Sequence, residues 1–481
     1  MERILIKNAS VVTMDDSLGD FEVADILIED GAIKDIRPGI DAEASVEAEV
    51  IDASGMIAIP GLWDAHRHTW QTGLRGILAD GRIPDYLRGF RLQMATLYRA
   101  EDMYAAQYAG GLDCLENGVT GLVDYCHNLI DEDYARASVE GLQASGVRGL
   151  FGHGMVPVTE NTFADGKGLS EGSDNLDLSS NWRFELARKI RKEYFNDSDV
   201  LQFGIAPQET AIAPAAEVAQ EFALARELNA RITFHANQVA VPDGGQRDMN
   251  TLLEHDLLGP DVNLVHMTFS NPDEWDIIDG TGASVTVCAE TEMQMGMGFP
   301  VIEQATRHTK AGPSLGMDCT SSTSGDMLAH ARLVLQCTRW LSDADHYRNF
   351  THPKKINWTT RDALAWITIN GARAAGVDHL TGSLTPGKRA DIVLLDMSGI
   401  AWAGWNRADP CSMVVSQANS RNVHTVMVDG QIVKRGGPLL HIDAKGAVDR
   451  LEASHDYLVD IMNQNGGFIP QPPVPLPLYE T

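Results

Sequence analysis

The chain has 481 residues, of which 44% are hydrophobic and 22% are charged, as in an ordinary globular protein. Its 38 Lys and Arg against 67 Asp and Glu give a formal net charge of −29, which argues against nucleic acid or an anionic membrane as a partner. The six cysteines include no Cys-x-x-Cys pair, and neither the N-terminus nor any other stretch is long and apolar enough for a signal or membrane segment. These features predict reduced thiols and a cytoplasmic protein without a membrane span.

The two ends of the chain share a β-rich texture. The first 58 residues contain short apolar runs separated by turn residues such as Glu29-Asp30-Gly31. The same pattern returns at 390–395 and 423–430. We therefore expect one small β-sandwich composed of residues 1–58 together with 384–440.

The middle of the chain, residues 59–383, alternates short apolar strands with amphipathic segments. The expected strands are 58–68, 119–125, 146–152, 201–206, 231–235, 263–266, 283–287 and 313–318. Eight strands alternating with helices predict an α/β fold, a (β/α)8 TIM-like barrel. Residues 441–481 are expected to form a C-terminal helix and a Pro-rich tail in an extended polyproline conformation.

Several side chains suited to metal binding fall at the C-terminal ends of these strands, where the sites of such barrels lie. They are His66, His68, His235, His266 and Asp318. Alternate side chains on a strand share a face, so His66 and His68 are expected to point the same way and to form half of a divalent metal site. Their common position predicts a metal centre at one end of the barrel.

Around these residues the chain resembles the amidohydrolase superfamily, specifically the mononuclear deaminase and chlorohydrolase branch that includes guanine and cytosine deaminases and triazine hydrolases. The resemblance rests on Pro60-Gly61 before the His-x-His pair, on the remaining His and Asp, and on the stretch 382–393. It implies that His66, His68, His235 and Asp318 hold one divalent metal ion, expected to be Zn with Fe as the alternative. Binuclear relatives carry a Lys on the fourth strand, and 200–206 contains none. We therefore expect a single metal.

The resemblance also implies a hydrolase in which water activated by the metal attacks an sp2 carbon of a small nitrogen heterocycle. Asp318 would take the proton of that water, and His266 would hydrogen-bond the water or the substrate. Three further residues are candidate substrate contacts. Gln71 matches a heterocycle-binding glutamine of relatives, Trp70 could stack on a flat ring or pack under the loop, and Gln208 stands where many relatives have His.

One position departs from the pattern of the branch. Its deaminases usually carry Glu three residues after the fifth-strand His, where this chain has Gln238. A glutamine cannot exchange a proton at neutral pH, so we expect Gln238 to orient the substrate during catalysis. This departure favours opening of a cyclic amide, or another carbon–nitrogen hydrolysis, over deamination. Glu209, Glu290 or Glu292 could replace the missing acid, and the sequence does not choose among them.

Two other functions remain open at this point. A hydrolytic dehalogenase of a heteroaromatic ring would share every metal ligand, and a non-catalytic binding or scaffold protein could keep the same fold. The intact ligand set argues against the scaffold. Because relatives are commonly oligomeric and the Pro-rich tail carries few charges, we expect a homo-oligomer with residues beyond 463 near an interface.

Overall fold

The computed structural model describes residues 3–40, 48–156, 182–195, 200–210, 213–240 and 247–473. Contacts divide the chain into two compact units. The first comprises 1–65, 113–122 and 325–442, and the second comprises 66–112, 123–324 and 443–481. Residues 474–481 of the expected Pro-rich tail lie outside the described part.

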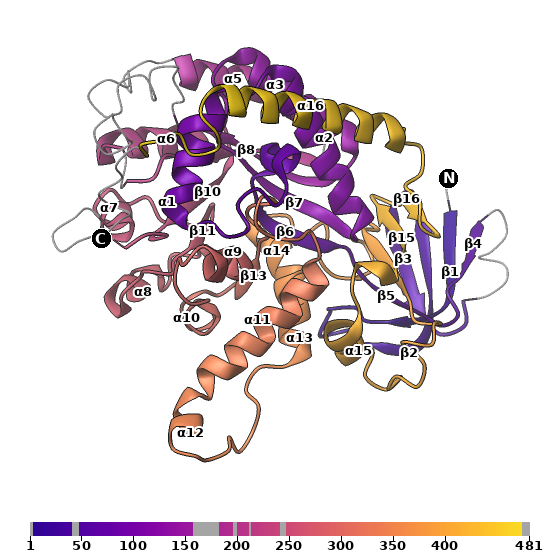
Figure 1. Cartoon of the computed structure of the whole chain (residues 1–481). Coiled ribbons are helices and arrows are strands. Elements are labelled where there is room, and N and C mark those ends of the chain that lie inside the picture. The colour runs from indigo at the N-terminus through magenta and orange to yellow at the C-terminus, as the bar shows by residue number, and fades with distance from the viewer. Residues whose placement is uncertain are drawn as a thin grey trace. The chain divides into compact units, whose positions relative to one another are not determined.

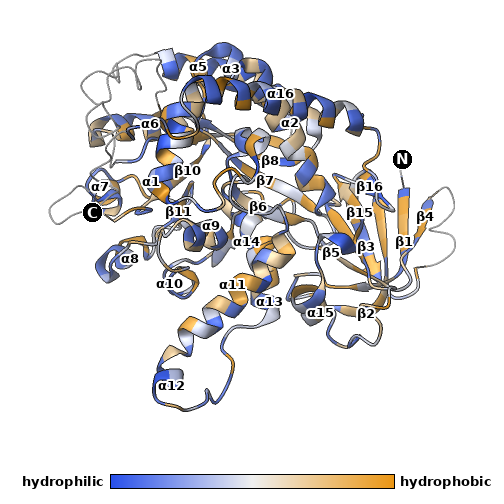
Figure 2. Cartoon of the chain, viewed as in Figure 1, coloured by the Kyte–Doolittle hydropathy of each residue, from blue (hydrophilic) through white to orange (hydrophobic). Residues whose placement is uncertain are grey.

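The first unit contains a mixed eight-stranded sheet built from both ends of the chain (Figure 1). Its strands are β1 (Arg3–Val11), β2 (Phe21–Glu29), β3 (Ala32–Arg37), β4 (Glu49–Asp52), β5 (Met56–Pro60), β14 (Ile392–Asp396), β15 (Val423–Val428) and β16 (Gln431–Arg435). Their order is β16-β15-β14-β5-β1-β2-β3, and β4 pairs with β1. Figure 2 shows β1 and β15 as strongly hydrophobic. Buried side chains from both ends, such as Ile26 and Ile392, share one core. Each such burial is worth about 1.5–3 kcal/mol, which holds the two ends together.

The helices of this unit follow the barrel strands in sequence. They are α11 (Met327–Ser342), α12 (Ala344–Arg348), α13 (Thr360–Trp366), α14 (Ile369–Ala374), α15 (Pro410–Gln417) and the short 3-10 helix η6 (Ser420–Asn422). The side chain of Asp326 accepts a hydrogen bond from Ala329 N and so caps the N-terminus of α11.

Eight parallel strands form the second sheet, in the order β6 to β13. They are β6 (Leu62–Arg67), β7 (Val119–Cys126), β8 (Arg148–Gly154), β9 (Leu201–Ala206), β10 (Arg231–Ala236), β11 (Val262–His266), β12 (Ser284–Val287) and β13 (Pro313–Leu315). Almost every residue of these strands is buried, as expected for strands covered on both faces. The expected fold class, a barrel with a separate sheet from both termini, is confirmed. The domain boundaries at residues 58 and 384 remain a prediction.

Helices of the second unit alternate with the barrel strands, as in a (β/α)8 fold. They are α2 (Ala100–Glu116), α3 (Glu132–Ser145), α5 (Trp182–Tyr194), α6 (Ala215–Glu227), α7 (Asp248–Glu254), α8 (Pro272–Ile278), α9 (Ala289–Gln294) and α10 (Ile302–His308). No helix in the described ranges is long and apolar enough to cross a membrane. All six cysteines are free thiols.

The segment after β6 is irregular. It consists of the 3-10 helix η2 (Thr69–Leu74), the short α1 (Ile83–Tyr86), the π-helix η3 (Leu87–Gln93) and the 3-10 turn η4 (Met94–Thr96). The C-terminal helix α16 (Ala444–Gln464), which carries both hydrophobic and hydrophilic residues in Figure 2, packs against η2. After α16, the ring of Phe468 lies 5.2 Å from the ring of Phe90 in η3. A distant part of the chain therefore supports this segment.

The barrel closes where β6 meets the residues that follow β13. Asp318 N donates to His66 O at 2.9 Å, and His68 N donates to Asp318 O at 2.8 Å. The strand can approach this closely because residue 316 is a glycine. A Cβ atom at Gly316 would lie 2.7 Å from the Cβ atom of His66.

We predict that Gly316→Ala destabilises the protein by about 1–3 kcal/mol or more, because the new methyl group overpacks the closure between β6 and the last strand. Gly73→Ala is a matched control, since its Cβ atom would meet its nearest neighbour at an ordinary 3.6 Å. Urea unfolding of both variants measures the difference. Equal stability of the two variants would contradict this account of the closure.

Candidate metal centre and substrate pocket

Four of the predicted ligands converge at the C-terminal end of the barrel. His66 lies in β6, His68 directly follows it, His235 lies in β10, and Asp318 follows β13. His66 Nε2 lies 3.2 Å from His235 Nε2 and 3.5 Å from Asp318 Oδ1. His68 Nε2 lies 3.2 Å from the same carboxylate oxygen. The four side chains are almost completely buried.

Neighbouring acceptors fix the protonation of two of these histidines. His68 Nδ1 donates to the main-chain oxygen of Tyr125 at 2.9 Å, and His235 Nδ1 donates to Glu209 Oε1 at 2.6 Å. Burial lowers the pKa of His235 well below its ordinary value, so its imidazole stays neutral. Both rings then turn an unprotonated Nε2 toward the centre, as metal-bound histidines do when a second group holds Nδ1–H.

The cluster fits a divalent cation. Unprotonated ring nitrogens and a carboxylate oxygen face one another in a buried cluster, an arrangement that repels unless a cation lies between them. Two ligands bound at about 2.1 Å to one tetrahedral ion are separated by about 3.4 Å, close to the separations observed here. Three imidazoles and one carboxylate fill a tetrahedron, so a water molecule would bind as a fifth ligand.

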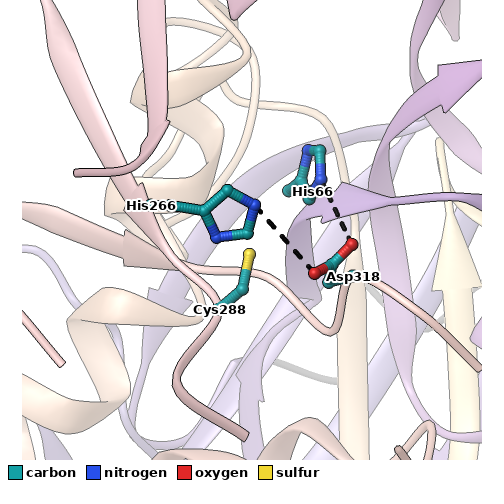
Figure 3. Close-up of side chains that lie close together, drawn as sticks. All are labelled: His66, His266, Cys288 and Asp318. Atoms are coloured by element: carbon teal, nitrogen blue, oxygen red, sulfur yellow. Dashed lines mark ion pairs between the residues drawn. The ribbon is translucent and has the colours of Figure 1, made fainter. Parts of the chain in front are cut away.

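His266 and Cys288 adjoin this cluster (Figure 3). Their ligand atoms and those of His66 and Asp318 all lie within 4.8 Å of one another. His266 Nδ1 contacts Glu292 Oε1 at 3.1 Å, which leaves Nε2 facing Asp318 Oδ2 at 4.0 Å. Both His266 (φ +77°) and Asp318 (φ +64°) adopt left-handed backbone conformations, which cost energy in a non-glycine residue and concentrate at functional sites. The two oxygens of Asp318 thus have different surroundings.

A pocket opens onto this cluster. Its polar wall contains Gln238, Glu209, Arg91, Tyr86, His127 and Cys319, and its apolar wall contains Ile83, Leu87, Val156, Val239, Met295 and Met297. His68, His235, His266 and Asp318 form its base. One apolar wall facing a wall of polar groups suits a small ligand that combines a flat apolar face with hydrogen-bonding atoms.

Among the glutamates considered as replacements for the missing acid, Glu209 lines the pocket. Its Oε1 atom accepts from His235 and lies 3.5 Å from Gln238 Nε2. Burial raises the pKa of Glu209. Glu292 is fully buried behind His266, and Glu290 is half-buried on α9, so neither lines the described pocket.

The three predicted substrate contacts lie behind the pocket wall. Trp70 and Gln71 are fully buried in η2, and Gln208 is buried after β9. Gln208 Nε2 donates to Glu221 Oε1 at 2.7 Å, away from the pocket. None of the three belongs to the lining in the described part of the chain, and their direct contact with substrate remains a prediction.

Instead, Trp70 begins a chain of hydrogen bonds that ends at Asp318. Trp70 Nε1 donates to His127 Nδ1 at 3.0 Å, and His127 Nε2 lies 3.2 Å from Tyr86 Oη. Since an indole N–H can only donate, His127 carries its proton on Nε2 and donates to Tyr86. Tyr86 in turn bonds the thiol of Cys319, which donates to Asp318 Oδ1 at 3.2 Å. The donor and the acceptor of each hydrogen bond are thereby fixed, and this series of hydrogen bonds restrains the rotation of the Asp318 carboxylate.

Sequence reasoning missed Tyr86, Arg91 and Cys319. All three lie in irregular segments, where neither periodicity nor a motif marks a residue. The segment 86–94 contains both Arg88 and Arg91 among apolar residues, and the sequence does not distinguish the two.

Comparisons with known proteins agree with this geometry. A family model described as "Amidohydrolase family" matches residues 57–433. The chain belongs to the amidohydrolase family. It is a hydrolase. The chain is 25% identical over 475 residues to the 5'-deoxyadenosine deaminase of Methanosarcina mazei, covering 96% of this chain and 100% of that protein.

Two solved structures share the fold of this amidohydrolase. One is an adenosine deaminase from Xanthomonas campestris with bound zinc, which has a TM-score of 0.80 and 21% identity and covers 95% of this chain and 98% of that one. The other is the atrazine chlorohydrolase of Arthrobacter aurescens complexed with zinc, also with a TM-score of 0.80 and 21% identity. The match covers 94% of this chain and 100% of the chlorohydrolase chain.

We predict about one equivalent of divalent metal per chain, from the single set of converging ligands. His235→Ala should lose the metal, whereas His153→Ala should retain it, because His153 is buried in β8 outside the cluster. Elemental analysis of the purified variants provides the measurement. Two equivalents in the wild type, or retained metal in His235→Ala, would contradict the ligand set.

Proposed function

We propose that this amidohydrolase cleaves a carbon–nitrogen bond at an sp2 carbon of a small nitrogen heterocycle and releases ammonia or an amine. The observation that carries the proposal is the convergence of His66, His68, His235 and Asp318 at the base of a pocket with one apolar and one polar wall. The apolar wall suits the face of a flat ring, and the polar wall suits its heteroatoms. The similarity to a deaminase of an adenine nucleoside supports the same reaction class.

Asp318 is the proposed general base. A divalent ion held by the four ligands would act as a Lewis acid and bring the pKa of water toward neutrality. Asp318 would accept the proton of the attacking water as the carbon–oxygen bond forms, and would then deliver it to the departing nitrogen as the carbon–nitrogen bond breaks. Oδ2 suits this role because Oδ1 already faces His66, His68 and Cys319. His266 Nε2 lies on the Oδ2 side, where it would hold the water or the substrate.

Gln238 would orient the ring rather than transfer a proton. Its amide lines the pocket, and Glu209 Oε1 lies 3.5 Å from Nε2. Since Nε2 is directed at Glu209, the amide oxygen is the part of Gln238 left to accept a hydrogen bond from an N–H or amino group of the substrate. This arrangement suits ring-amide opening as well as loss of an exocyclic amine.

We further propose zinc as the metal and a homo-oligomer in the cytoplasm as the working form. The free cysteines support a reducing compartment. Exposed apolar side chains on α11 and beyond it, including Trp340 and Phe350, support association. The place of residues beyond 463 at an interface remains a prediction, which light scattering of the full chain and of a chain ending at residue 463 would test.

The activity is tested with a panel of purines, pterins, triazines and cyclic amides, read by ultraviolet change and by release of ammonia and chloride. Release of ammonia or amine, or ring opening, supports the proposal. Chloride release as the main reaction would favour a dehalogenase. A metal-loaded protein that turns over none of these classes would leave a binding or scaffold role.

On the substrate so found, we predict that Asp318→Asn lowers kcat roughly 10²–10⁴-fold or more, because both a base and a ligand are lost. Gln238→Ala should cost about 10-fold, the order of one neutral hydrogen bond. Gln143→Ala, on α3, is the matched control and should leave kcat unchanged. A sharp gain in deamination by Gln238→Glu, together with an active Asp318→Asn, would overturn these roles.

A further inference from the structure

Arg91 is a buried cation in the wall of the pocket. It lies on the π-helix η3, and only 9% of its surface is exposed. Within the described ranges its guanidinium makes one hydrogen bond, from Nη1 to the main-chain oxygen of His127 at 3.2 Å. No ion pair of Arg91 occurs among these residues either, whereas Arg88 on the same helix pairs with Asp85 at 3.8 Å. In the described part of the chain, Arg91 is therefore a pocket cation with no carboxylate at ion-pair distance.

Burying such a cation costs free energy unless a counter-charge or hydrogen-bond acceptors bind it. A guanidinium has five N–H donors, and a buried charge normally finds a counter-charge or several hydrogen bonds. Burial lowers the pKa of Arg91, but arginine stays protonated. The pocket-lining carboxylate Glu209 is already engaged with His235 and Gln238. The remaining donors of Arg91 are thus left for a molecule in the pocket.

The position of Arg91 limits which part of the substrate it can reach. It donates to the main-chain oxygen of His127, and the ring of that residue stacks on the metal-ligand candidate His68 with a ring separation of 4.2 Å. Arg91 also lines the same pocket as His68, His235 and Asp318. A substrate that reacts over these ligand candidates would therefore share the pocket with the guanidinium.

We infer that the substrate carries an oxygen acceptor on the reacting ring, either a ring carbonyl or a carboxylate bonded directly to the ring, and that Arg91 binds this oxygen. The planar fork of arginine matches such oxygens and makes charge-assisted hydrogen bonds to them. This inference rests on the proposed function and adds a substrate class to it. Rings without an oxygen substituent should be poor ligands.

The test uses matched ligands that share an amino group and differ in the oxygen. One set is 4-aminopyrimidine, cytosine and 4-aminopyrimidine-2-carboxylate, and the second is adenine with 2-oxoadenine. Calorimetry with the metal-loaded enzyme gives Kd for each ligand, and ammonia release gives kcat/KM. Comparing Kd for cytosine with Kd for 4-aminopyrimidine-2-carboxylate shows whether Arg91 prefers a neutral or an anionic oxygen. Binding is measured independently of turnover, so a failed reaction does not decide the inference.

We expect the wild type to bind an oxygen-bearing member about 10- to 100-fold more tightly than its partner, the value of one or two charge-assisted hydrogen bonds. Arg91→Met should abolish this preference and leave Kd for the oxygen-free ligands within about 2-fold, since it removes the charge and the donors that bind the oxygen but keeps an unbranched side chain. Arg91→Lys should restore part of the preference, because it keeps the charge but loses the fork. Arg88→Met is the matched control and should keep the preference, since Arg88 does not line the described pocket.

Three results would overturn the inference. The first is the absence of any preference of the wild type for oxygen-bearing ligands. The second is a preference that survives in Arg91→Met. The third is failure of the wild type to bind any ligand of the two sets. If Arg91→Met does not fold, Arg91→Lys decides the question through its partial preference. Preference for the oxygen-bearing ligands without any ammonia release would support the inference and count against the proposed deamination.

Discussion

The site depends on main-chain pairing at the barrel closure. The hydrogen bonds between His66, His68 and Asp318 that seal the cylinder also set the distances among three of the metal-ligand candidates. Closing the sheet and assembling the ligands are therefore one event. A ligand set fixed by backbone pairing needs little rearrangement when it receives a metal, since the polar atoms are already at ligand separations. The same pairing forces Asp318 into a left-handed conformation, so part of the cost of the site is carried by the fold.

Behind the ligands, a second layer of acceptors directs each ring. The main-chain oxygen of Tyr125 holds His68, Glu209 holds His235, and Glu292 holds His266. Glu209 is unusual among these because it both supports a ligand candidate and lines the pocket. Its carboxylate accounts for the glutamine at position 238, since a second carboxylate there would repel it at short range. The departure from the pattern of the branch is thus matched by a charge on the neighbouring strand.

The ligand candidates could be predicted from the sequence because each follows a recognisable apolar strand, and parallel strands end at one rim. The residues of the polar wall of the pocket could not be predicted from the sequence. Arg88 and Arg91 lie three residues apart in one segment, and the sequence does not indicate which of them faces the pocket and which pairs with Asp85. Tyr86 and Cys319 owe their roles to hydrogen bonds across irregular segments. The prediction for Trp70 left stacking and packing open, and its indole N–H is committed to His127.

The contact of Phe468 with η3 bears on the order in which the protein is made. Gly89 leaves the space that the Phe468 ring fills, since a Cβ atom there would lie 2.1 Å from the ring. Gln93 Nε2 also donates to the main-chain oxygen of Asn465, a residue 372 positions later in the chain. The metal-ligand candidates all leave the ribosome before that partner does. During synthesis the barrel can therefore close while the wall that carries Tyr86 and Arg91 still lacks its support, so that this wall is among the last parts of the site to be completed.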